Sequence, residues 1–294
     1  MIVCVANIGS TSLKTTILSV EAEGKQKRLG AANLDRIKDS APSNFKCVDG
    51  EGKSAERSVE LQGYGPGLRF LLDWYLEKGI ISSVAEIECI GFKCVLGKTN
   101  GANLLTPEIL KEMEEFLFIA PVHNGPYLEG IGELKKIIDA PMVGVFEPSF
   151  HYSVPEYRRY LGLPWEWHDL GIRKYGFHGA SHRFLGASAY RLIGREDGRV
   201  ITVHLGGSSS ICAHRNGRSV DINQDFSPNS GLLQGTRSGY IDGSALLYAM
   251  DKLGLSVREA QEEISYNGGL RSMAGLGTDD MRAIMGAAEK GDRR

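Results

Sequence analysis

Residues 3–12, VCVANIGSTS, and residues 200–209, VITVHLGGSS, follow one pattern, and this repeated pattern decides the fold. In each copy an apolar run leads through one polar residue to a glycine, and small hydroxyl residues and a second apolar run follow. An apolar run that breaks at glycine and then resumes is typical of a β-hairpin. Because internal repeats mark related structural units, we predict two related domains, each with such a hairpin. We place the boundary between them near residue 150, which gives domains at residues 1–150 and 151–294.

The turn of such a hairpin has a specific chemistry. Glycine lets the backbone approach an anion closely, successive backbone N–H groups form a concave nest, and hydroxyl groups add further donors. A single turn of this composition is more often an ordinary β-turn. Two matched copies favour a function, and we expect the two hairpins to hold a polyphosphate between the domains, with Lys14 adding positive charge.

The composition is that of an ordinary globular protein. The 294 residues include 34 basic and 36 acidic side chains, which gives a net charge of −2, and 42% are apolar. This balance lacks the basic stripe expected of a nucleic-acid-binding protein, and no window is apolar over the roughly 18 residues that a membrane-spanning helix requires. The 37 glycines exceed ordinary usage without a matching excess of proline, so we expect them to serve backbone geometry.

The N-terminal sequence and the cysteines indicate the cellular compartment of the protein. The opening stretch, MIVCVANIGS, lacks the basic and apolar regions of a signal peptide. The five cysteines are scattered and odd in number, without a CxxC pair, which argues against a disulfide framework or a structural zinc site. We therefore expect a cytoplasmic protein with reduced thiols, no nucleic-acid partner and no membrane association.

Apolar runs that alternate with helical periodicity indicate an α/β protein. Strands are expected at residues 2–6, 15–20, 88–95, 142–146, 199–206 and 211–214, with a hairpin turn at Asn216-Gly217. Helices are expected at residues 67–78, 106–118, 184–193, 244–253, 257–264 and 279–290. Residues 22–60 show weak periodicity and are predicted to form edge strands and loops.

Six segments, in order along the chain, carry a resemblance to a known family. They are NIGSTSLK at residues 7–14, APVHN at 120–124, VFEPSFH at 145–151, RKYGFHGASH at 173–182, HLGGSSS at 204–210 and GTRSG at 235–239. Together they make the chain similar to the acetate kinase family, within the superfamily of sugar kinases, heat-shock chaperones and actin. The resemblance implies duplicated actin-like (ribonuclease H-like) ATPase domains, the second incomplete. Family members commonly dimerise, so a homodimer is a further expectation from the resemblance.

The resemblance implies reversible transfer of a phosphoryl group from ATP to acetate, with Mg²⁺, giving acetyl phosphate and ADP. Cations and hydrogen-bond donors must stabilise the charge on the moving group. His178 and Arg237 match the family positions for this role, and the planar fork of Arg237 suits phosphate or carboxylate. Outside these motifs the same residues would be interpreted as a core histidine and a surface arginine. Glu147 matches the catalytic carboxylate that holds the metal, and Asn7 is expected to share the Mg²⁺.

The family positions also imply the substrate and nucleotide residues. The carboxylate is expected at Lys93, with its alkyl group in an apolar pocket of Val95, Val122, Phe177 and Pro228. Val122 stands where leucine is usual, so the acid could be longer, as in propionate. The nucleotide and its phosphates are expected at Asn7, Ser10, Ser12, Lys14, His204, Gly206, Gly207, Ser208, Ser209, Asp280 and Arg282. Asp280 and Arg282 are equally well interpreted as charges at a helix N-terminus.

Several departures from the family pattern fall at the site. In GFKCVLGK, at residues 91–98, two family histidines are lost and an arginine is replaced by Lys93. Lysine keeps the positive charge but does not recognise a carboxylate through two parallel hydrogen bonds. Glu147 replaces an aspartate, and Gly207 replaces an asparagine. Relatives also continue past the end of this chain with an adenosine-binding loop.

These departures leave two alternatives to a carboxylate kinase. One is a related kinase with a changed acceptor, which the altered GFKCVLGK segment favours. The other is an inactive nucleotide-binding or partner-binding remnant, which the lost histidines and the C-terminal shortfall favour.

Overall fold

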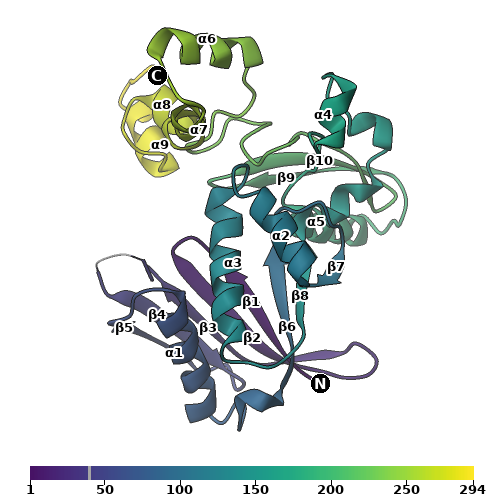
Figure 1. Ribbon diagram of the computed structural model, residues 1–294, viewed down its shortest axis with the longest axis vertical. Coiled ribbons are helices and arrows are strands. Elements are labelled where there is room, and N and C mark those ends of the chain that lie inside the picture. The colour runs from purple at the N-terminus through teal and green to yellow at the C-terminus, as the bar shows by residue number, and fades with distance from the viewer. Residues whose placement is uncertain (39–40) are drawn as a thin grey trace. The chain divides into compact units, whose positions relative to one another are not determined.

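The computed structural model describes residues 1–38 and 41–294, apart from the side chains of Pro121 and Val122. The chain divides into two compact units, Met1–Phe146 and Glu147–Arg294, drawn in Figure 1 from purple to teal and from teal to yellow. This division lies close to the boundary predicted at residue 150. In the part of the chain that is described, no helix is long and apolar enough to cross a membrane.

The first unit is built on a mixed sheet of eight strands in the order β5-β4-β3-β2-β1-β6-β8-β7. The strands are β1 (Ile2–Ile8), β2 (Ser12–Val20), β3 (Gln26–Asp35), β4 (Ser43–Asp49), β5 (Ser54–Val59), β6 (Ile87–Cys94), β7 (Ala102–Leu104) and β8 (Met142–Phe146). β1 to β5 form an antiparallel meander, and β6 and β8 continue the sheet parallel to β1. The strands predicted in this unit are confirmed.

The described part of residues 22–60 differs from the predicted edge strands and loops. These residues do not supply only edge strands, because β3 and β4 lie inside the sheet, whereas β5 lies at one of its two edges. Every second residue is buried from Gly30 to Leu34 in β3 and from Ser43 to Cys47 in β4. Polar and charged residues on the other face hide this alternation from a search for apolar runs.

Three α-helices complete the described part of the first unit. They are α1 (Tyr64–Glu77), α2 (Pro107–Glu115) and α3 (Pro121–Lys135), with a short 3-10 turn η1 (Val84–Glu86). α1 and α3 pack against each other and against the sheet, α1 on β2 and β3, and α3 on β1 and β6 (Figure 1). α2 begins as predicted, because the Thr106 hydroxyl accepts from the Ile109 N–H and Pro107 occupies the first turn. The sequence did not predict α3, since Pro126 and three glycines interrupt its pattern.

Asn124 on α3 ties separate parts of this unit together. Its amide is buried and donates to the carbonyl oxygens of Leu96 and Met113 over 2.8 and 2.9 Å. Replacing Asn124 with leucine would leave both carbonyl oxygens without this donor, so we expect the variant to lose about 2–4 kcal/mol of unfolding free energy in urea denaturation. Asn103→Leu removes an exposed bond to the Asn100 carbonyl oxygen and should lose less than about 1 kcal/mol. Equal losses in the two variants would contradict the prediction.

The second unit combines a three-stranded sheet, in the order β11-β10-β9, with a series of helices. Its strands are β9 (Arg199–Leu205), β10 (Ser209–Arg215) and β11 (Arg218–Ile222). Its helices are α4 (Trp165–Asp169), α5 (Gly179–Leu192), α6 (Gly243–Leu253), α7 (Val257–Glu262), α8 (Gly269–Ala274) and α9 (Met281–Glu289), with 3-10 turns η2 (Glu147–Ser153) and η3 (Glu156–Arg158) and a π-turn η4 (Glu263–Asn267). The predicted hairpin turn is confirmed, since Asn216 and Gly217 have φ of 52° and 75°, as a tight hairpin requires.

Both copies of the repeated sequence form hairpins, and their registers differ. β1 and β2 pair from Ile8 opposite Leu13, whereas β9 and β10 pair from Leu205 opposite Ser209. The first turn is therefore one residue longer than the second. The repeated sequence thus forms two hairpins whose turns differ in length by one residue.

Candidate active site

His178 lies just before α5 in a turn with an unusual backbone. Its φ and ψ are 56° and 29°, a left-handed conformation that is uncommon for residues other than glycine. Gly176 has a φ of 78°, and a Cβ there would lie 2.8 Å from the His151 ring. Phe177 between them is buried. Backbone conformations of this kind cluster at functional sites, which makes this turn the first candidate.

The same turn packs against η2, which begins at Glu147. A Cβ on Gly179 would overlap the Glu147 carbonyl oxygen, so only glycine fits at the start of α5. His151 of η2 donates from Nε2 to the Phe177 carbonyl oxygen over 3.0 Å. These contacts bring two of the predicted catalytic residues, Glu147 and His178, into adjoining segments of one unit.

His178 and His204 form a stacked pair. Their ring centroids are 4.1 Å apart and their planes are inclined by 16°. Nδ1 of His178 lies 2.8 Å from the Ser210 hydroxyl, and Nδ1 of His204 lies 3.0 Å from the Ser181 hydroxyl. The structure therefore brings together two histidines that come from separate motifs.

The loop that carries Arg237 is joined to the second hairpin. The Gly235 N–H donates to the Gly207 carbonyl oxygen over 3.1 Å, and the Ser209 N–H donates to the Gln234 side chain over 3.3 Å. The turn at residues 206–208 and the GTRSG loop are thus held as one structure. Both segments were predicted to contact phosphates, and this connection places them side by side.

Arg237 lies beside Pro228, a predicted substrate residue. Its Nη1 is 3.5 Å from the Pro228 carbonyl oxygen, and burial lowers the pKa of its guanidinium group. Gln234 also donates to the Pro228 carbonyl oxygen, over 2.9 Å. Gln234 thus links the hairpin, the Arg237 loop and Pro228, and its only signal in the sequence is its position just before GTRSG.

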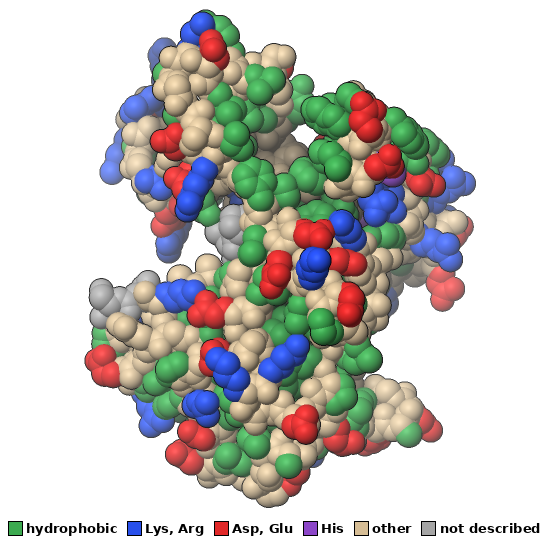
Figure 2. All heavy atoms as spheres, in the orientation of Figure 1, with side chains coloured by type: hydrophobic (Ala, Val, Ile, Leu, Met, Phe, Trp, Pro, Cys, Tyr) green, Lys and Arg blue, Asp and Glu red, His purple; other side chains and the backbone are tan. Residues whose placement is uncertain are grey.

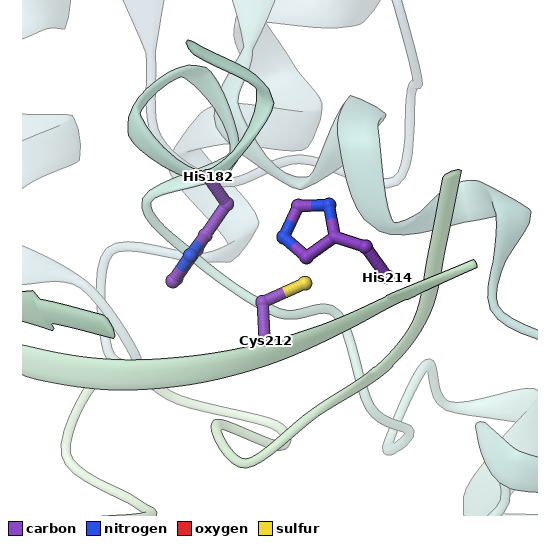
Figure 3. Close-up of side chains that lie close together, drawn as sticks. All are labelled: His182, Cys212 and His214. Atoms are coloured by element: carbon purple, nitrogen blue, oxygen red, sulfur yellow. The ribbon is translucent and has the colours of Figure 1, made fainter. Parts of the chain in front are cut away.

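A buried cluster of His182, Cys212 and His214 adjoins this region (Figure 3). His182 projects from α5 and the other two project from β10, and their possible ligand atoms lie within 4.8 Å of one another. The Thr202 hydroxyl lies 2.7 Å from both His182 Nδ1 and His214 Nε2, so it occupies the space between the two rings. Burial raises the pKa of the Cys212 thiol to about 11, and a protonated thiol is a poor metal ligand. We therefore interpret the cluster as a hydrogen-bond network.

In the first unit, the predicted phosphate residues lie around the end of β1 and the start of β2. Asn7 and Lys14 are directly opposite each other in the sheet, so their side chains share one face, and both are exposed. The Tyr127 hydroxyl donates to Asn7 Oδ1 over 2.8 Å. Ser10 and Ser12 lie in and just after the turn. Lys14 also lines an open hollow of about 570 Å³ over β2 to β5.

The predicted carboxylate residues of the first unit lie at the end of β6. Lys93 is exposed on the strand, and Val95 is buried just beyond it. The side chain of Val122 lies outside the described residues. In the second unit, Phe177 and Pro228 are buried, so each of these apolar positions whose side chain is described is buried.

Asp280 and Arg282 lie at the start of α9. The Asp280 carboxylate caps the helix by accepting from the Arg282 N–H, and it also forms an ion pair with the Arg282 side chain at 2.7 Å. The interpretation as helix-terminal charges therefore accounts for both side chains as they are seen here. Their role in nucleotide binding stays a prediction.

The charged side chains are mixed on the face drawn in Figure 2. Lys and Arg side chains lie among Asp and Glu side chains there, in keeping with the net charge of −2.

Comparisons with known proteins show which family the chain is similar to. Residues 2–294 match the model of the acetokinase family. An acetate kinase of Clostridium botulinum (strain Hall) is 35% identical over 100% of this chain and 75% of its own length. The crystal structures of a Porphyromonas gingivalis acetate kinase and a Francisella tularensis propionate kinase are each 30% identical, with TM-scores of 0.78 and 0.85, and the match covers 99% of this chain and 73% and 74% of theirs. The actin-like α/β fold is therefore shown, and the chain spans about three quarters of the length of these relatives. On its sequence and its fold alike, the chain belongs to the acetokinase family.

Proposed function

We propose that this protein is an acetate kinase-like phosphotransferase that moves the γ-phosphoryl group of ATP to a short-chain carboxylate. The observation that carries the proposal is the assembly of the His178–His204 pair and the Arg237 loop around the second hairpin. This assembly supplies imidazole, guanidinium and backbone donors in one unit, and phosphoryl transfer depends on such donors. The similarity to acetate and propionate kinases supports the same reaction.

In the proposed reaction, a carboxylate oxygen attacks the γ-phosphorus while the bond to the β,γ-bridging oxygen breaks, so that ADP leaves and an acyl phosphate forms. A carboxylate is ionised at neutral pH, so the attack needs no general base. Lys93 orients the carboxylate, and His178 and Arg237 donate to the phosphoryl oxygens, on which charge is spread in the transition state. His204 and the N–H groups of residues 206–208 hold the remaining phosphates.

The other predicted residues keep their roles within this proposal. Val95, Val122, Phe177 and Pro228 receive the alkyl group of the acid. Asn7, Ser10, Ser12, Lys14 and Ser209 bind phosphate oxygens, and Asp280 and Arg282 contact the nucleoside.

A divalent cation, which we propose to be Mg²⁺, would be held by oxygen ligands. Asn7 and Glu147 supply amide and carboxylate oxygens, which are the donors that Mg²⁺ prefers. The bond from the Tyr127 hydroxyl orients the Asn7 amide. When bound, the ion neutralises charge on the phosphates.

We further propose that the enzyme is cytoplasmic and forms a homodimer. The first proposal is supported by the five cysteines, all of which are free thiols in the structure. The second rests on the family resemblance and is tested by sedimentation of the purified chain.

Trapping of the product tests the proposed reaction. With ATP, Mg²⁺, acetate and hydroxylamine, the protein should produce acyl hydroxamate, because hydroxylamine captures an acyl phosphate. Acetate, propionate and butyrate compared side by side give the preferred chain length. Lys93→Met should raise the KM for the acid by about 10-fold or more, whereas Lys136→Met, at an exposed position, should leave it unchanged.

Two results would contradict the proposal. ADP release that depends on an acceptor other than these acids would favour a kinase with a changed acceptor. Binding of Mg-ATP in calorimetry without any turnover would favour an inactive nucleotide-binding remnant.

A further inference from the structure

A continuous chain of hydrogen bonds runs from His178 into the interior of the second unit. The Ser210 hydroxyl lies 2.8 Å from His178 Nδ1 and 2.7 Å from His182 Nε2. The Thr202 hydroxyl lies 2.7 Å from His182 Nδ1 and 2.7 Å from His214 Nε2. Every member beyond His178 is buried. We call these five residues the histidine relay.

Each hydroxyl has one proton, and within the described residues its hydrogen-bond contacts are with two relay rings, so the proton has an acceptor only in the relay. The relay can therefore be ordered in only two ways. Ser210 donates either to His178 or to His182 and accepts from the other. Burial lowers the pKa of His182 to about 3, so its ring is neutral and carries one proton. If one ring nitrogen of His182 donates a hydrogen bond, the other ring nitrogen therefore has no proton and accepts one. The direction of the hydrogen bonds at one end of the relay consequently determines their direction at the other end.

Nδ1 of His214 selects between the two orders. It is buried and has no hydrogen-bond partner within the described residues, and a Cβ on Gly186 of α5 would lie only 2.7 Å from it. If the relay ran inward from His178, this nitrogen would carry a proton without an acceptor. If the relay runs outward, the same nitrogen is a bare lone pair. Buried N–H groups without an acceptor are rarer in proteins than buried acceptors without a donor. The outward order is therefore favoured.

We propose that the histidine relay is a positioning device that holds His178 as the Nε2–H tautomer. In the outward order, His214 donates to Thr202, Thr202 to His182, His182 to Ser210, and Ser210 to Nδ1 of His178. When His178 carries a single ring proton, that proton then lies on Nε2, where it can be donated to a phosphoryl oxygen. Figure 3 shows that His182 of α5 and His214 of β10 lie close together. The donation from Nε2–H of His178 to a phosphoryl oxygen rests on the proposed function. The tautomer itself rests on the hydrogen bonds of the relay alone.

Nitrogen-15 NMR of the histidine-labelled protein near neutral pH tests the tautomer, because protonated and bare imidazole nitrogens resonate far apart. We expect His178 to show a protonated Nε2 and a bare Nδ1. Ser210→Ala and Thr202→Val should each produce a mixture of both tautomers, and Thr202→Ser should preserve the original one. Ser219→Ala is the matched control, because it removes a buried hydroxyl that contacts His151 instead, and it should leave the His178 signals unchanged.

Kinetics supply the second readout. Ser210→Ala should lower kcat for acyl phosphate formation by about 10-fold, as is usual for residues that orient a functional group, with little change in the KM for ATP. A proton on Nδ1 of His178 in the unsubstituted protein would overturn the proposal, and this measurement requires no variant. Signals for His178 that are identical in the Ser210→Ala, Thr202→Val and unsubstituted proteins would overturn it as well. The expected tautomer in a protein without kinase activity would support the relay and contradict the proposed function.

Discussion

Replacing Arg237 with lysine is expected to lower kcat for acyl phosphate formation by about 100-fold or more. Lysine keeps the charge and loses the fork of donors that can contact two phosphoryl oxygens at once. Loss of one donor to a developing oxyanion commonly costs about 10²–10³ in kcat. The hydroxylamine assay at saturating ATP and acetate gives kcat, and the melting temperature shows whether the variant remains folded.

Two further variants separate a catalytic role of Arg237 from a structural one. Added guanidinium should restore part of the activity of Arg237→Ala, because it can occupy the vacated position. Arg258→Lys, on the exposed surface of α7, should behave like the unsubstituted protein. A kcat for Arg237→Lys within about threefold of the unsubstituted value would show that the guanidinium fork is not used in the transition state.

Lowering the pH from about 7 to about 5.5 is expected to remove about 2–3 kcal/mol from the unfolding free energy of the second unit. Burial lowers the pKa of His151 to about 4 and that of His182 to about 3, and it shifts the pKa of His214 in the same direction. In an unfolded chain each histidine titrates near 6.5. Between these values the unfolded state binds protons that the folded state excludes, so stability is complete above about pH 6.5 and falls as the pH decreases toward 4. Each group contributes about 1.4 kcal/mol per pH unit in this range, and the estimate counts only His151 and His182.

Urea denaturation at several pH values measures this dependence. Trp165 and Trp167 belong to the second unit, so their fluorescence in a Trp74→Phe background reports on that unit. His151→Gln keeps a donor for the Phe177 carbonyl oxygen but cannot titrate, and it should remove about half of the pH dependence. His168→Gln, on the surface helix α4, is the control and should retain it. An unfolding free energy that stays constant between pH 7 and 5.5 would contradict the burial of neutral histidines.

The fold was predictable where its signals are local. The hairpin of β1 and β2, the Thr106 cap of α2 and the turn at Asn216 depend on residues that are adjacent in sequence. α3 depends instead on packing against α1, and Pro126 lowers its intrinsic helix propensity, so no local pattern announces it. The interior position of β3 likewise follows from strand pairing, which a single sequence does not display.

The residues of the candidate site also fall into two groups, those with a local signal in the sequence and those without one. His178, His204 and Arg237 stand in distinctive motifs, and these motifs were enough to single them out. Ser210 and Thr202 are common residue types whose importance comes from the register of β9 and β10, which sets Ser210 opposite His204 and Thr202 opposite Cys212. A register is a property of two paired strands, so the histidine relay could not be predicted from either strand alone.

The left-handed backbone of His178 determines which substitutions this position accepts most easily during evolution. Besides glycine, asparagine and aspartate adopt this conformation most readily. Changing the first base of either histidine codon to A gives asparagine, and changing it to G gives aspartate. The mutations that this turn accepts most easily therefore remove the imidazole while sparing the shape of the chain. Among descendants of such a gene, asparagine or aspartate at this position would mark lineages that kept the fold and abandoned the chemistry.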